Sequence, residues 1–210
     1  MNCETLPDVK SYNVIGELRG TEHPEEIIVV GGHLDSWDLA EGAHDDGTGV
    51  MQSIEVLRAL HAIGVKPKRT IRAVMFMNEE NGVKGGKAYG ENTQSKKEKH
   101  ILAMESDAGG FTPRGFPMNM PQEKKDKILK WKDYFFPYGV YDFTRKGGGT
   151  DISPLEKQGV PVMDLSPDNQ RYFIIHHTAR DTFEQVNKRE LEMGAIVMTM
   201  MIYLVSEYGL

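Results

Sequence analysis

Apolar residues along this chain gather in short continuous runs that alternate with segments of helical spacing. The runs at 27–32, 71–77, 101–105 and 159–166 are continuous enough to predict strands that are buried on both faces. Residues 48–63 place apolar side chains at helical spacing before Gly64, which predicts a helix that ends there. This alternation of strands and helices indicates an α/β fold with a mostly parallel sheet covered on both faces.

The N-terminal part of the chain has a second, weaker strand pattern. Residues 11–20 alternate between apolar and polar positions, and the polar segment 21–26 follows them. With the buried run at 27–32, this pattern predicts a hairpin of two neighbouring strands.

Two further helices are predicted toward the C-terminus. Residues 122–136 combine many lysines with apolar residues on or near one face, which is typical of a surface amphipathic helix. Asn187, followed three residues later by Glu190, has the spacing of a capping box and predicts the start of a helix over 188–207. We expect a short helix or a turn at 85–92.

Composition limits the classes of partner. The chain has 210 residues, 39% hydrophobic and 27% charged, which suits a single globular domain over 1–210. A net charge of −6 argues against a nucleic-acid partner. Cys3 is the only cysteine, so no internal disulfide can form. The apolar run at 193–205 is too short to span a bilayer, and residues 1–10 lack a signal-peptide pattern, so we expect no membrane association.

Histidines and carboxylates follow the predicted strands repeatedly. Ligands of open α/β sheets bind outside the carboxyl ends of the strands, and that is the edge where these residues fall. Four separate segments contribute them: His33-Leu34-Asp35, Asn78-Glu79-Glu80, Asp107 and His176-His177. We therefore expect these segments to form one site.

The negative charge expected at this site calls for cations. Asp45, Glu79, Glu80 and Asp107 would converge as four carboxylates, and each pair at about 4 Å repels by about 4 kcal/mol at an effective dielectric constant of about 20. Imidazoles combined with carboxylates suit zinc better than calcium or magnesium, which prefer oxygen ligands. A pair of zinc ions bridged by one carboxylate is the arrangement of aminopeptidase-type hydrolases.

Seven segments in series resemble one known family. They read "GGHLDSWD…GA.DDG.G", "PKRT", "EE", "MESDAG", "GGGTDI", "GVP" and "YFIIHHTARDT", in order from about residue 26 to about residue 186. The chain is similar to the M28 zinc exopeptidases, and most to their carboxypeptidase Q branch. This resemblance implies a three-layer α/β/α sandwich with a mostly parallel mixed sheet.

The resemblance also implies roles for individual residues. Metal ligands would be His33, Asp45 and Asp107 for one zinc, and Asp45, Glu80 and His177 for the other, with Asp45 bridging both. Glu79 would be the general base of the catalysed hydrolysis and Asp35 a carboxylate beside His33. His176 is a further candidate for contact with the oxyanion and Asp151 for contact with substrate.

Several expectations follow from the resemblance with alternatives left open. Substrates would be short peptides or dipeptides, and an aminopeptidase of the same family is the close alternative. A glutaminyl cyclase, which is a single-zinc acyltransferase on the same scaffold, is a more distant one. Relatives carry an N-terminal helical segment and a protease-associated domain that we expect to be absent here. We expect the full-length protein to be secreted or periplasmic, and a homodimer is possible.

The remaining histidines and glycines favour structural roles. We expect His23, His61 and His100 to have no function, and His44 to lie at the surface or on the rim of the site. Gly147–Gly149 lack the spacing of a phosphate-binding loop and are expected to let the backbone approach the cleft.

Overall fold

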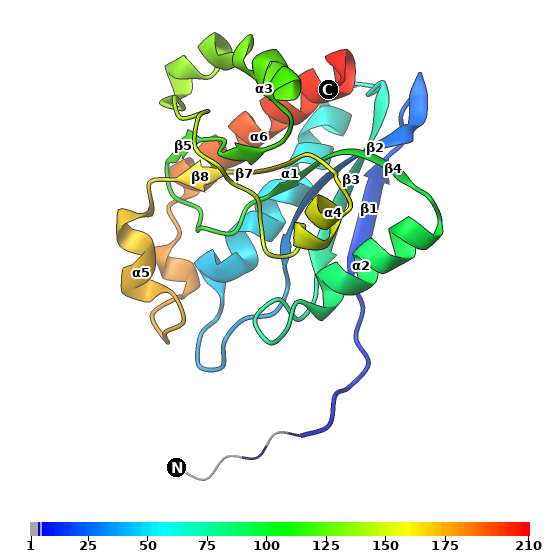
Figure 1. The fold of residues 1–210 in the computed structure, drawn as a ribbon. Helices are drawn as coiled ribbons and strands as arrows, with labels where there is room; N and C mark the ends of the chain where they lie inside the picture. Colours follow the sequence, from blue (N-terminus) through cyan, green and yellow to red (C-terminus); the bar gives the residue numbers. More distant parts are fainter. Residues whose placement is uncertain (1–3, 5) are drawn as a thin grey trace.

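The centre of the molecule is a six-stranded sheet with the order β1-β3-β2-β4-β7-β6 (Figure 1). The computed structural model describes residue 4 and residues 6–210, so Cys3 and the prediction about it lie outside the described residues. Strands β3, β2, β4 and β7 run parallel to one another, and the edge strands β1 and β6 pair antiparallel with β3 and β7. The strands are β1 (Val14–Leu18), β2 (His23–His33), β3 (Arg69–Phe76), β4 (Lys99–Glu105), β6 (Met118–Asn119) and β7 (Val162–Asp164).

Helices cover the sheet on both faces. On one face, α1 (Thr48–Ala62) and α6 (Lys188–Tyr208) pack against each other and on Ile28 and Val30 of β2. On the other face, α2 (Lys84–Ser95) and α4 (Ser153–Lys157) cover Ile27 and Val29. Successive side chains of a strand point to opposite faces, so one apolar strand serves both cores. The three-layer α/β/α sandwich expected from the sequence is confirmed.

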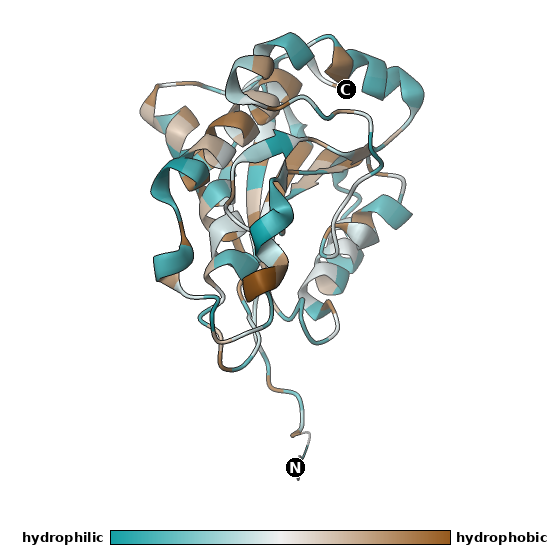
Figure 2. Ribbon diagram, turned by 90° about the vertical axis from the view of Figure 1, so that its left-hand side faces the viewer, coloured by the Kyte–Doolittle hydropathy of each residue, from teal (hydrophilic) through white to brown (hydrophobic). Residues whose placement is uncertain are grey.

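The colouring by hydropathy follows the same layers. In Figure 2 the helices alternate between hydrophobic and hydrophilic residues along their length, as expected of helices with one buried face. The remaining elements are short: η1 (Ala43–Gly47), β5 (Pro113–Gly115), α3 (Gln122–Leu129), η2 (Lys132–Tyr134), η3 (Phe136–Tyr138), β8 (Ser166–Pro167), η4 (Asn169–Arg171), α5 (Tyr172–Ile175) and η5 (Phe183–Gln185). Strands β5 and β8 form a separate small antiparallel sheet.

The predicted hairpin is wrong. Strand β1 pairs with β3, which lies between β1 and β2. The segment taken for a tight turn is occupied by the start of β2 at His23, and the backbone N–H groups of Thr21 and Glu22 donate to carbonyls of Pro67 and Lys68. The segment between β1 and β2 is therefore held by the residues that precede β3. Strand β2 has a parallel neighbour on each side, β3 and β4.

Two predicted elements are shorter than the pattern suggested. The helix expected over 122–136 ends at Leu129 and continues as two short turns, with Pro137 in the second. The strand expected over 159–166 divides between β7 and β8, which belong to different sheets. In both segments the apolar pattern extends beyond the point where the regular element ends.

The capping prediction for α6 is confirmed in part. The Asn187 side chain accepts hydrogen bonds from the N–H groups of Arg189 and Glu190, as a helix N-cap does. The Glu190 carboxylate does not complete a capping box, since it binds Arg171 and Thr112. By length and composition alone, α6 would be able to cross a membrane. Its apolar side chains pack against α1 and the sheet, as in the core helix of a folded domain.

His100 makes the stability of the fold depend on pH. Its side chain is buried on β4, 2.9 Å from the Tyr89 hydroxyl, and burial together with the charge of Arg72 lowers its pKa from 6.5 to about 4. Below pH 6.5 the unfolded chain binds a proton that the folded state refuses, so stability falls as the pH drops from 6.5 to about 4. The loss reaches about 3 kcal/mol at most.

We expect His100→Gln to flatten this dependence. Urea unfolding of the wild type and the variant at pH 4.5 and 7.5 measures it, and His61→Gln on an exposed helix position is the control. An equal loss of stability at low pH in wild type and His100→Gln would contradict the assignment.

Candidate metal centre

The carboxyl ends of three parallel strands meet at one edge of the sheet. His33 is the last residue of β2 and pairs with Phe76 at the end of β3, while Gly31 pairs with Glu105 at the end of β4. The residues that follow these strands therefore lie side by side, as the sequence predicted.

Two groups of metal-binding side chains converge there, and Asp45 belongs to both. His33 Nε2 lies 3.2 Å from Asp45 Oδ1 and 3.4 Å from Asp107 Oδ1. His177 Nε2 lies 3.2 Å from Asp45 Oδ2 and 3.1 Å from Glu80 Oε2. The structure thus brings His33, Asp45 and Asp107 together as one compact group, as the sequence predicted. The second compact group is Asp45, His176 and His177, and of the second predicted set Glu80 contacts it through His177.

Both histidines of the 176–177 pair reach Asp45. His176 Nε2 lies 3.3 Å from Asp45 Oδ2, close to the position of the His177 nitrogen, and the two rings stack at 3.6 Å. His177 also reaches Glu80. The His177 backbone has a φ of 57°, in the left-handed region that a residue with a side chain seldom adopts. Such strain is typical of functional sites.

The polar atoms at the centre lack partners within the described chain. Buried atoms without a hydrogen bond include His33 Nε2, Asp45 Oδ2, Glu80 Oε1 and Asp107 Oδ1. Buried polar atoms are nearly always paired in native structures, so this concentration of unpaired atoms points to a bound ion. Nitrogen and carboxylate oxygen donors match zinc, and the residues present therefore fit that metal.

Two buried aspartates hold the backbone of the centre in place. Asp46 accepts hydrogen bonds from the N–H groups of His33 and Gly49, at 3.0 Å each. Asp181 accepts from the N–H groups of His44 and Asp45, at 2.7 and 3.0 Å. The sequence analysis missed both supporting roles.

The close approach around Gly49 leaves no room for a side chain. A Cβ atom there would lie 1.8 Å from the Ser106 carbonyl oxygen and 2.4 Å from Asp46 Oδ1. We expect Gly49→Ala to lower the free energy of unfolding by about 3 kcal/mol or more and to weaken metal binding, because the backbone must shift. Denaturant unfolding and zinc titration measure both effects. Gly16→Ala, where the nearest atom is 3.8 Å away, is the control, and equal behaviour of the two variants would contradict this prediction.

Asp35 fixes the pair Glu79 and Glu80. Its carboxylate accepts hydrogen bonds from the Glu79 N–H at 3.0 Å and the Glu80 N–H at 3.3 Å. His33 Nδ1 lies 2.8 Å from the Asp35 backbone oxygen but 3.9 Å from its carboxylate. Asp35 therefore orients His33 through its backbone, while its carboxylate holds the backbone of the two glutamates.

Glu79 is a stronger base than an exposed glutamate. Burial, and then the charge of Asp107, raises the pKa of Glu79 above its usual value. A carboxylate with a raised pKa takes up a proton more readily, which is the property that a general base requires.

Asp151 is held in the same region by a carboxylate that the sequence analysis overlooked. Glu105 accepts hydrogen bonds from the N–H groups of Thr150 and Ile152, on either side of Asp151. Asp151 is buried and neither of its carboxylate oxygens has a hydrogen-bond partner in the described chain. Burial, with the nearby charge of Glu79, raises its pKa to about 8. Gly149 makes this arrangement possible, since a Cβ there would lie 2.3 Å from Glu105 Cδ.

Comparison with known proteins identifies the family. The model of peptidase family M28 matches residues 13–202. The chain belongs to peptidase family M28. The match includes every residue of the two converging groups.

Individual relatives, compared by sequence or by solved structure, support the same family. Carboxypeptidase Q of Mus musculus is 35% identical over 207 residues, which are 99% of this chain and 44% of that protein. A peptidase M28 precursor from Shewanella amazonensis, solved by crystallography, superposes with a TM-score of 0.85 at 35% identity over 93% of this chain and 44% of that one. A zinc aminopeptidase from Bacillus subtilis has the same fold, with a TM-score of 0.72 at 21% identity over 91% of this chain and 49% of that one. The chain spans less than half the length of the curated relative.

His44 is not a rim residue of this M28 centre, and that prediction is wrong. Its side chain is fully buried, and its ring stacks on Phe111 at 4.3 Å. Its Nδ1 accepts a hydrogen bond from the Gly110 N–H at 3.1 Å. This burial could not be predicted from the sequence, because both partners come from a distant segment.

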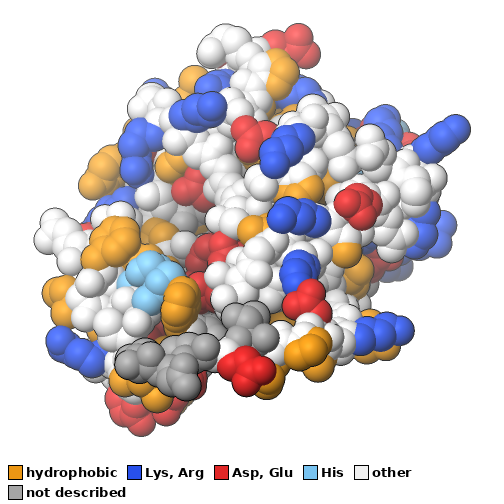
Figure 3. Space-filling view, turned by 60° about the horizontal axis from the view of Figure 1, so that its bottom comes forward, with side chains coloured by type: hydrophobic (Ala, Val, Ile, Leu, Met, Phe, Trp, Pro, Cys, Tyr) orange, Lys and Arg blue, Asp and Glu red, His pale blue; other side chains and the backbone are white. Residues whose placement is uncertain are grey.

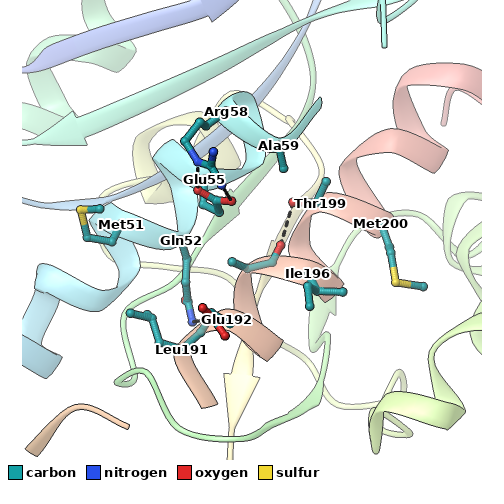
Figure 4. A pocket seen from close by; sticks show the side chains of 11 residues that line it. Met51, Gln52, Glu55, Arg58, Ala59, Leu191, Glu192, Ile196, Thr199 and Met200 are labelled. Atoms are coloured by element: carbon teal, nitrogen blue, oxygen red, sulfur yellow. Dashed lines mark hydrogen bonds and ion pairs between the residues drawn. The ribbon is translucent and has the colours of Figure 1, made fainter. Parts of the chain in front are cut away.

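A separate apolar hollow lies between α1 and α6, away from the metal centre (Figure 4). It has a volume of about 510 Å³, and Figure 4 shows Met51, Ile196 and Met200 along it with the paired Glu55 and Arg58 at one end. Its lining includes no histidine, so its chemistry does not resemble that of the centre at the sheet edge.

Proposed function

We propose that this chain is the catalytic part of a two-zinc exopeptidase that hydrolyses short peptides. The observation that carries the proposal is Asp45, whose two carboxylate oxygens lie 3.2 Å from His33 Nε2 and from His177 Nε2. His33, Asp45 and Asp107 would hold one zinc ion, and Asp45, Glu80 and His177 the other. Family membership supports zinc and peptide hydrolysis.

The residues around the ions have separate tasks in this proposal. Zinc bound here lowers the pKa of a coordinated water molecule and polarises the peptide carbonyl. Glu79 accepts the proton of the attacking water and returns it to the leaving amine. Asp35 holds the Glu79 backbone in place through the Glu79 N–H. His176 and Asp151 line the centre as candidates for contact with the oxyanion and with the substrate.

Metal analysis and a dipeptide panel test the proposal. Protein loaded with zinc and then freed of excess metal should contain two zinc ions per chain, as measured by inductively coupled plasma mass spectrometry. Free, N-blocked and C-amidated dipeptides separate the possibilities, since an aminopeptidase requires a free amine and a carboxypeptidase a free carboxylate. One zinc per chain with cyclisation of glutaminyl peptides would favour a glutaminyl cyclase and overturn the peptidase assignment.

A further inference from the structure

Tyr172 is a buried tyrosine beside the metal centre that belongs to neither proposed ligand set. It is the first residue of α5, and only 6% of it is exposed. Its ring packs with Phe111 and Ile175 in a small apolar cluster and lies 4.8 Å from the His176 ring. Its carbonyl oxygen accepts a hydrogen bond from the His176 N–H at 2.9 Å. Both the backbone and the ring of Tyr172 are therefore fixed in place.

The Tyr172 hydroxyl faces the carboxylates of the centre. It lies within hydrogen-bonding reach of the Asp45 carboxylate and close to those of Asp46 and Asp107. A tyrosine hydroxyl is protonated at neutral pH, and an ionised carboxylate only accepts hydrogen bonds, so the hydroxyl is the donor in this contact. Buried tyrosine hydroxyls usually have such a partner.

Asp45 needs a donor of this kind once metal is bound. The nitrogen atoms of His33 and His177 that lie 3.2 Å from its carboxylate would then be occupied by zinc and could not hydrogen-bond to it. Among the described side chains in reach of this carboxylate, that leaves His176 and Tyr172 as donors.

These two donors differ in how firmly they are held. Figure 3 shows histidine side chains at the surface of the face that carries the centre, next to hydrophobic and acidic ones. The His176 side chain is 27% exposed, whereas Tyr172 is buried among apolar residues and cannot turn away from the carboxylate. Tyr172 is therefore the donor with the more fixed direction.

We propose that Tyr172 is a positioning residue whose hydroxyl donates a hydrogen bond to Asp45 and holds this carboxylate in the direction in which it bridges the two ions. The inference rests on the proposed function, because Asp45 is the ligand that the two zinc sets share. Without the hydroxyl, the carboxylate can rotate about its Cβ–Cγ bond and spends less time in the bridging geometry. Removing an outer partner of a metal ligand typically weakens metal binding by about 10- to 100-fold.

Tyr172→Phe tests this role, because it removes the hydroxyl and keeps the ring against His176. We expect the variant to bind zinc about 10- to 100-fold more weakly than the wild type in competition with a chromophoric chelator. Thermal unfolding of the two metal-free proteins should differ little. Equal zinc affinity of the variant and the wild type would overturn the proposal.

The matched control is Tyr89→Phe, which removes the hydroxyl of another buried tyrosine. Tyr89 is 4% exposed, and its hydroxyl lies 2.8 Å from Arg72 Nη1 and 2.9 Å from His100 Nε2. This variant loses hydrogen bonds of the fold but should bind zinc as the wild type does. Equal weakening of zinc binding in both variants would show a general loss of stability and would overturn the proposal.

Kinetics separate positioning of the ligand from direct contact with substrate. A hydroxyl that acts through Asp45 is needed mainly for metal binding, so Tyr172→Phe should recover most of its turnover when zinc is raised to saturation. A loss of turnover that persists at saturating zinc, together with wild-type zinc affinity, would assign the hydroxyl to the substrate and overturn the positioning role.

Failure of the proposed function gives a different result. If the wild type binds two zinc ions but hydrolyses no dipeptide, the peptidase assignment fails, and the zinc affinities of wild type and Tyr172→Phe still decide the role of Tyr172. A wild type that binds a single ion overturns the positioning role, since Asp45 then bridges nothing. A wild type that binds no zinc overturns both.

Discussion

Glu79→Gln is expected to lower kcat/KM for dipeptide hydrolysis by a factor of about 10² to 10⁴ while the zinc content stays unchanged. The size of the loss is that of removing a positioned general base. Glutamine has nearly the shape of glutamate but cannot accept the proton of the attacking water. Glu79 belongs to neither proposed ligand set, so we expect Glu79→Gln to retain its zinc.

Substitution of the adjacent Glu80 should have a different effect from that of Glu79→Gln. Glu80→Gln should weaken zinc binding as well as turnover, because the Glu80 carboxylate lies 3.1 Å from His177 Nε2. Glu91→Gln on the exposed face of α2 is the control and should change neither quantity. Zinc content is measured after gel filtration, and kinetics at saturating zinc. Near-normal turnover by Glu79→Gln, or loss of zinc from it, would refute the division of labour between the two glutamates.

Much of the fold was open to prediction because its strands are buried on both faces. Continuous apolar runs at 27–32, 71–77 and 101–105 identify β2, β3 and β4, and such strands require helices on each side. The pairing of β1 was not open to prediction in the same way. Its alternating pattern fits an edge strand, but the choice of partner depends on contacts between Thr21, Glu22 and the segment that enters β3.

Part of the candidate centre can likewise be predicted from local sequence patterns, and part depends on contacts between distant segments. Residues that follow strand ends, such as His33 and Asp107, are located by the topology of a parallel sheet. Asp181 and Glu105 accept backbone N–H groups from segments far away in sequence, at separations of 136 and 47 residues. No spacing rule connects such partners, so their supporting roles emerge only from the fold. The metal-binding roles themselves stay predictions.

Crowded carboxylates explain why metal and fold depend on each other here. Asp45 and Asp46 are buried with the partly buried Asp107 beside them, and burial raises the pKa of both Asp46 and Asp107. Without a cation, ionisation of Asp46 and Asp107 opposes folding, because the site is poorly solvated and like charges repel there. A bound cation reverses the sign of that interaction and should stabilise the folded state by its binding free energy.

Asp45→Asn should therefore abolish activity and separate metal binding from folding. The amide keeps the size of the carboxylate but has a single oxygen and no charge, so it cannot supply an anionic oxygen to both groups. We expect zinc to fall below one ion per chain and kcat/KM to fall by a factor of about 10³ or more, since metal-dependent water activation is lost.

Thermal unfolding with and without zinc measures this independently of turnover. Zinc should raise the Tm of the wild type, because a ligand bound only by the folded state stabilises it, and should leave the Tm of Asp45→Asn almost unchanged. In the presence of a chelator the variant should be less stable than the wild type near neutral pH, because burial raises the pKa of Asp45 but the neighbouring histidines lower it overall, so the ionised carboxylate stabilises the fold. Asp38→Asn in the exposed part of the same loop is the control and should behave as the wild type. Retention of two zinc ions by Asp45→Asn would refute a bridging role for this residue and leave each group of ligands to bind its ion alone.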